Sequence, residues 1–80
     1  TISINPSDSQ KLLSYSEKYR LARSNDGGKT WEKLTETFSG ETPLFISFNR
    51  QTPETIYLLT EKNSIYKSIN GGDVWKKVRL

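Results

Sequence analysis

Apolar and polar residues alternate in short runs along this chain, with the two-residue period of β-strands. Residues 2–4 and 44–48 alternate in this way. Residues 12–15 and 56–59 are mostly apolar on both faces, as in strands at the centre of a sheet. No stretch carries apolar residues at i, i+3, i+4 and i+7 over three turns, the pattern of an amphipathic helix. The pattern therefore predicts an all-β protein.

The sequence also repeats itself. Residues 2–5 fall on residues 46–49, an offset of 44, and the same offset superimposes the rest of the two halves without a gap. The matched pairs include Ser24 with Ser68, Gly27 with Gly71, Gly28 with Gly72, Trp31 with Trp75 and Lys33 with Lys77. We therefore expect two copies, residues 1–36 and 45–80, joined by a linker at residues 37–44.

Turn signals divide each copy into four predicted strands. Clusters of Asn, Asp, Gly, Ser and Pro stand between the apolar runs, at residues 5–8, 25–28, 40–43, 63–64 and 70–72. Four consecutive strands per copy indicate an antiparallel meander. A repeat of about 40–50 residues with four strands is typical of a β-propeller blade. The predicted fold is thus two four-stranded antiparallel propeller blades, part of a larger or oligomeric propeller.

The turn before each fourth strand holds the most specific motif. Residues 24–31 match S-x-D-x-G-x-T-W at every fixed position, which are Ser24, Asp26, Gly28, Thr30 and Trp31. Residues 68–75 are a degenerate copy, with Ser68, Gly72 and Trp75 retained, Asn70 in place of Asp and Val74 in place of Thr. The motif resembles the Asp-box, or bacterial neuraminidase repeat, of a propeller superfamily. That superfamily includes sialidases, xyloglucan-cleaving hydrolases, sortilin-type receptors and photosystem II assembly factors.

The motif also has a physical interpretation. Glycines supply the positive φ that a tight hairpin needs. Asp26 can accept hydrogen bonds from turn amides, and the indole N–H of Trp31 can reach a carbonyl. Asn70 can accept the same bonds without the strengthening effect of a charge. We therefore expect a structural role for both turns and lower stability for the second one, and the resemblance likewise implies structural Asp-boxes at the outer rim.

Composition narrows the possible chemistry. The chain has 80 residues, no Cys and no His, which excludes Ser-His-Asp and Cys-His catalysis and any zinc site that uses imidazole or thiolate. The formal charge of +3 comes from scattered cations interleaved with acids, so no nucleic-acid-binding surface is expected. A calcium loop around Asp26 is disfavoured because Gly27, Gly28 and Lys29 occupy the ligand positions. We expect no metal, no cofactor and no membrane span.

Two hypotheses for function follow. The first is a non-catalytic repeat module that serves as a structural scaffold or as a ligand- or protein-binding surface. The alternative, which the resemblance implies, is part of a sialidase-like or xyloglucanase-like glycoside hydrolase propeller; glycosidases need two carboxylates across a pocket, and propellers supply these from several blades. The sequence favours the first. The resemblance also favours an exported, extracytoplasmic protein.

The expected partners are further blades, because two blades cannot close a ring and leave two apolar faces in water. These blades would come from a homo-oligomer of three or four chains or from the remainder of a parent chain. A glycan or peptide ligand is expected at the loops, and the candidate contacts are Arg50, Phe38 and Glu41.

Overall fold

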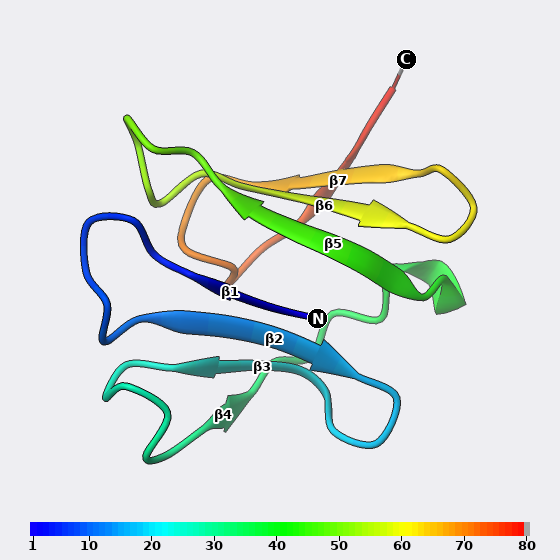
Figure 1. The fold of residues 1–80 in the computed structure, drawn as a ribbon. Helices are drawn as coiled ribbons and strands as arrows, with labels where there is room; N and C mark the ends of the chain where they lie inside the picture. Colours follow the sequence, from blue (N-terminus) through cyan, green and yellow to red (C-terminus); the bar gives the residue numbers. More distant parts are fainter. Residues whose placement is uncertain (80) are drawn as a thin grey trace.

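The computed structural model describes residues 1–79 as two four-stranded antiparallel sheets (Figure 1). The first sheet consists of β1 (Ile2–Ile4), β2 (Leu12–Ser16), β3 (Arg20–Ser24) and β4 (Glu32–Lys33), in that order. The second consists of β5 (Pro43–Phe48), β6 (Ile56–Thr60), β7 (Ile65–Ser68) and β8 (Lys76–Val78). Within the described residues the only helical element is the short 3-10 segment η1 (Phe38–Gly40). The prediction of an all-β fold with two four-stranded antiparallel meanders is confirmed.

The strand register sorts side chains onto two faces of each sheet. In the first sheet Leu13 pairs with Arg23 and Tyr15 with Leu21, so these four residues share one face. We call this the front of a sheet. In the second sheet the residues at the same repeat positions, 44 further along the chain, also share a face, because Tyr57 pairs with Lys67. The opposite face of each sheet is called the back.

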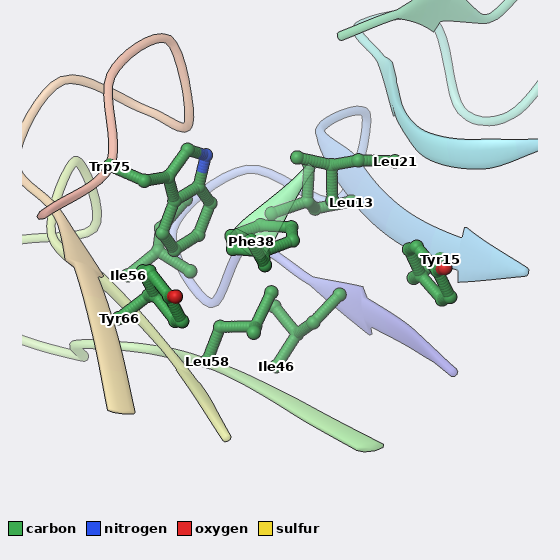
Figure 2. Packing of buried hydrophobic residues seen from close by; sticks show 9 residues of the cluster. All are labelled: Leu13, Tyr15, Leu21, Phe38, Ile46, Ile56, Leu58, Tyr66 and Trp75. Carbon is green, nitrogen blue, oxygen red and sulfur yellow. The ribbon is translucent and has the colours of Figure 1, made fainter. Parts of the chain in front are cut away.

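The front of the first sheet packs against the back of the second. The innermost strands β1 and β5 are neighbours, and the two sheets spread outward from them (Figure 1). The space between the sheets holds one cluster of buried side chains (Figure 2). Its members are Leu13, Tyr15, Leu21, Phe38, Ile46, Ile56, Leu58, Tyr66 and Trp75. Both sheets therefore depend on a single core that neither could form alone.

Phe38 enters this core from the connection between the sheets. Its side chain is 0% exposed and lies between Leu13 and Leu21 on one side and the second sheet on the other (Figure 2). Its ring makes edge-to-face contacts with Tyr66 (centroids 5.1 Å apart) and Trp75 (5.4 Å). The expectation that Phe38 contacts a ligand from a surface loop is wrong. The physical reason is that the ring of Phe38 is a large apolar surface within the mostly polar segment 35–42, and removing it from water stabilises the fold.

The connection itself is tightly bent. Phe38, Ser39 and Gly40 all have positive φ, and β5 begins at Pro43, inside the segment 37–44 that was expected to be a linker. The Glu36 carboxylate accepts a hydrogen bond from the Phe38 N–H at 2.9 Å. This bend aims the Phe38 ring back between the sheets, so the connection is part of the core.

The other two faces lie open. Ile2 is 60% exposed on the back of the first sheet, and Tyr57 is 39% exposed on the front of the second. Phe45, at an irregularity in the β5–β6 pairing, is 65% exposed. No helix among residues 1–79 is long and apolar enough to cross a membrane.

Candidate functional site

The first Asp-box turn forms a closed set of hydrogen bonds on its own backbone. The Ser24 hydroxyl donates to Asp26 Oδ1 (2.8 Å) and accepts the N–H of Gly28 (2.9 Å). Asp26 accepts the N–H of Thr30 (2.9 Å) and the Thr30 hydroxyl (2.5 Å). The indole N–H of Trp31 donates to the Gly28 carbonyl at 3.0 Å. All five motif residues thus direct their polar atoms or backbone into the turn.

These bonds have an electrostatic consequence for Asp26. The hydroxyl and N–H of Thr30, followed by the Ser24 hydroxyl, lower the pKa of Asp26 from 3.8 to about 2. Hydrogen bonds donated to a carboxylate favour its charged form. Asp26 is therefore held ionised by the turn, the opposite of what a general acid requires.

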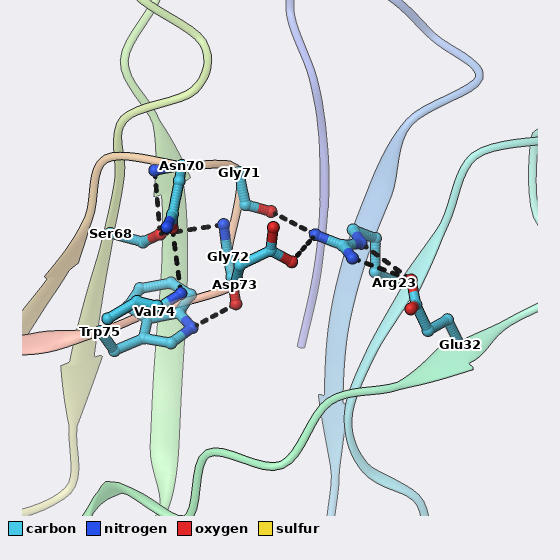
Figure 3. Close-up of polar contacts among 9 residues, drawn as sticks. All are labelled: Arg23, Glu32, Ser68, Asn70, Gly71, Gly72, Asp73, Val74 and Trp75. Carbon is cyan, nitrogen blue, oxygen red and sulfur yellow. Dashed lines mark hydrogen bonds and ion pairs between the residues drawn. The ribbon is translucent and has the colours of Figure 1, made fainter.

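The second turn repeats the geometry with one bond fewer. Ser68 donates to Asn70 Oδ1 (3.0 Å) and accepts the Gly72 N–H (2.9 Å). Asn70 Oδ1 accepts the Val74 N–H at 3.0 Å, and the Trp75 indole donates to the Gly72 carbonyl at 2.8 Å (Figure 3). Val74 has no hydroxyl to replace that of Thr30. The position equivalent to Gly28 is Gly72, and the two have φ of +96° and +101°, a conformation that favours glycine.

The two turns differ most in their surroundings. Trp75 is 7% exposed and packs in the core between the sheets, whereas Trp31 is 42% exposed on the back of the first sheet. A Cβ at Gly72 would lie 3.7 Å from the side chains of Leu13 and Leu34, both from the first copy. The second turn is therefore covered by the other sheet, and the first turn is open to solvent.

Arg23 joins the sheets at the second turn, and sequence reasoning missed it. Its guanidinium donates to Asp73 Oδ1 (2.7 Å), to the Gly71 carbonyl (3.2 Å) and to Glu32 Oε1 (2.8 Å) (Figure 3). Burial lowers the pKa of Arg23, and its bonds and attraction to Glu32 and Asp73 outweigh that effect, so the net pKa is raised. The only signal in the sequence is the alternation that places residue 23 on the same face as Leu13 and Leu21. We call these contacts the Arg23 clasp.

The candidate loop contacts do not come together. Phe38 is buried, as described above. Glu41 accepts a hydrogen bond from the Thr60 hydroxyl at 2.6 Å, and this bond, followed by one from Ser64, lowers its pKa. Arg50 is exposed in the connection between β5 and β6. Of the three, Arg50 is the one whose side chain is exposed on a loop.

A hollow of about 410 Å³ lies at the end of the two sheets that carries the β1–β2 and β5–β6 connections and both Asp-box turns. We call this the loop end. The turns are tied to the adjacent loops, because Gly27 N–H donates to the Gln10 carbonyl and Gly71 N–H to the Glu54 carbonyl, each at 2.9 Å. The polar residues lining the hollow are Asn5, Lys11, Arg23, Asn25, Glu54 and Asn70. No group of three or more acidic side chains that could hold a metal ion occurs within the described range.

Comparison with known protein families gives one finding. Residues 19–80 match the family model Sortilin-Vps10, described as sortilin, neurotensin receptor 3. The match spans both Asp-box turns and the whole second sheet. A search of curated proteins finds no match.

Proposed function

Since this chain belongs to the Sortilin-Vps10 family of Asp-box β-propellers, we propose that it is a non-catalytic module of two propeller blades. The first blade lies within residues 1–36, and the second begins with β5 at Pro43. The module serves as a structural scaffold and presents a surface that binds a protein segment or a glycan.

One observation carries the non-catalytic role. The motif with the most reactive residue types, Ser24, Asp26 and Thr30, uses its hydroxyls and carboxylate to hold its own turn. A carboxylate with a pKa of about 2 is a poor proton donor near neutral pH. Glu32 and Asp73 are likewise engaged by Arg23. These acids support the fold.

The open sheet faces support membership in a ring. Propellers have about 4–8 blades in most cases, and each blade is covered on both faces by its neighbours. Here the front of the first sheet and the back of the second cover each other. The back of the first sheet and the front of the second expose apolar side chains. Further blades would cover them, as proposed for a homo-oligomer or for the remainder of a longer chain.

The loop end is the proposed binding surface. A neighbouring blade on either side would cover sheet faces and leave this end accessible. Its hollow combines Lys11 with the amides of Asn5, Asn25 and Asn70, and a single acid, Glu54, lines it. Side-chain amides and the Lys11 ammonium suit the carbonyl groups of an extended peptide or the hydroxyls of a glycan.

An assay of hydrolysis separates this role from the glycosidase alternative. The purified chain is incubated with fluorogenic sialosides and with xyloglucan, beside its Glu54→Gln variant. We expect no turnover above a protein-free blank for either protein. Turnover by the wild type that Glu54→Gln abolishes would overturn the proposal.

Binding is tested separately with a peptide library and a glycan array. We expect retained ligands to be lost on Lys11→Glu and kept on Lys62→Glu, which makes the same charge change in the turn between β6 and β7, outside the hollow. A chain that retains neither class of ligand would contradict the binding role and leave the scaffold role.

A further inference from the structure

The contact between the sheets joins two unlike surfaces. The front of the first sheet contributes Leu13, Leu21 and Arg23, and the back of the second contributes Leu58 and Trp75. A front therefore meets a back. If further blades follow the same rule, the free front of the second sheet takes another back, and the free back of the first takes another front.

The free back differs in shape from the one in use. Ser14 and Ala22 occupy the positions that Leu58 and Tyr66 hold in the second sheet. Beside them lies a hollow of about 400 Å³, lined also by Trp31 and Lys33. On the free front, Leu59 and Ile65 stand where Tyr15 and Leu21 stand in the buried front. A second copy docked here would therefore bury fewer large apolar side chains than the observed contact, and its core would contain voids.

The charges differ more than the shapes. In the observed contact Arg23 on the front meets Asp73 on the facing turn at 2.7 Å, and Glu32 pairs with Arg23 across β3 and β4. On the free front the same two places hold Lys67 and Lys76, which pair across β7 and β8. On the free back the place of Asp73 is held by Lys29, which is exposed. A second copy would thus bring Lys29 against Lys67 and Lys76, with no acid at any of the three places.

Like charges brought together at a contact disfavour that partner, and this effect decides specificity more than affinity. We infer that the front of the second sheet docks a propeller blade whose back carries a carboxylate at the place that Asp73 holds in the second turn, where the free back of this chain has Lys29. The occupant is not a second copy of this chain. The inference rests on the proposed function, since it takes the chain to be part of a ring.

A charge-exchange cycle tests the inference by turning a second copy into the required neighbour. Lys29→Asp places a carboxylate where the second turn already carries Asp73, so the turn tolerates it. Lys67→Glu makes the reverse change on the free front. Self-association of the wild type, both single variants and the double variant is measured by sedimentation equilibrium, and near-ultraviolet circular dichroism of the tryptophans checks the fold. Lys62→Asp, in the turn between β6 and β7, is the matched charge control.

Each single variant is expected to lower the dissociation constant for self-association about tenfold or more, because it replaces repulsion by attraction across the contact. The double variant carries acids on both faces, so its dissociation constant returns to that of the wild type. Lys62→Asp leaves it unchanged. If Lys67→Glu unfolds, Lys29→Asp alone still tests the pairing against the native Lys67.

Three results would overturn the inference. In the first, the wild type self-associates as tightly as Lys29→Asp. In the second, neither single variant self-associates more tightly than the wild type. In the third, the double variant self-associates as tightly as the single variants. The first of these results, observed as a wild-type ring of fixed mass, would leave the proposed module intact. Glycoside turnover would have the reverse effect, so the two failures are distinguishable.

Discussion

The two Asp-box turns have nearly the same hydrogen bonds and opposite surroundings. The first has the full motif, with a charged acceptor in Asp26 and the extra bond from the Thr30 hydroxyl, yet it lies open to solvent. The second has Asn70 and Val74 in those places, yet it is covered by the first sheet and joined by the Arg23 clasp. The match to the motif and the packing against the other sheet therefore run in opposite directions here.

The comparison teaches that a turn can rely on two independent sources of stability. Charge-assisted bonds hold the exposed turn, where packing contributes little. Apolar packing holds the buried turn, where the motif has degenerated. Four comparisons, taken from the largest expected effect to the smallest, test this division.

The two tryptophans are expected to show the largest difference. Trp75→Ala removes a core side chain that contacts Phe38, so the free energy of unfolding should fall by about 3–5 kcal/mol. Trp31→Ala removes a half-exposed ring and should cost about 1–2 kcal/mol. Urea unfolding measures both. Equal losses would show that the core between the sheets does not stabilise the second turn.

The Arg23 clasp is expected to rank second. Arg23→Ala loses charge-assisted bonds to Asp73, Gly71 and Glu32, and should lower the free energy of unfolding by about 1–3 kcal/mol. Lys67→Ala, at the equivalent position, loses a cation–π contact with Tyr57 and should cost under about 1 kcal/mol. The same urea series gives both values. A Lys67→Ala loss as large as that of Arg23→Ala would contradict the role of the clasp.

Replacing the hydrogen-bond acceptors of the two turns, Asp26 and Asn70, is expected to give the third-largest difference in stability. Asp26→Ala removes a charged acceptor with bonds from Thr30 and Ser24, and Asn70→Ala removes a neutral acceptor that lacks the hydroxyl partner. The melting temperature should therefore fall by a few degrees more for Asp26→Ala than for Asn70→Ala. Thermal unfolding at neutral pH measures the difference. The opposite ranking would mean that the local bonds do not decide the stability of the first turn.

The smallest effect is the response to acid. The folded chain holds the pKa of Asp26 at about 2, below the ordinary 3.8, so ionised Asp26 stabilises the fold above about pH 4. This contribution is lost as the pH falls toward about 2. The melting temperature of Asp26→Asn should therefore decline less over that window than that of the wild type. Asn70→Ala is the control and should keep the wild-type acid response; a wild-type response in Asp26→Asn would exclude the carboxylate as its source.

Much of the fold was predictable because its strands and turns depend on residues that are close together in the sequence. The alternation in residues 2–4 and 44–48 and the glycines of the two turns predicted the strands and their antiparallel order, and the structure confirms this. Strand alternation and turn residues act over a few neighbours, so a single sequence reveals them.

The burial of Phe38 in the core and the contacts of the Arg23 clasp could not be predicted from the sequence in the same way. Both depend on which sheet face meets which, and the repeat offset relates equivalent positions without stating how the copies pack. Phe38 stands in a polar segment, and nothing in its neighbours indicates burial. Arg23 and Lys67 look interchangeable in the repeat, although among residues 1–79 Arg23 is the one that faces an acid across the sheets.

The order in which the core residues leave the ribosome follows from this arrangement. Leu13 and Leu21 are synthesised before Tyr66 and Trp75, the side chains from the second sheet that share their core. The first sheet therefore emerges with its apolar front uncovered and cannot complete its packing until the second sheet has been translated. Long-range contacts of this kind slow folding and leave apolar surface open to aggregation until they form.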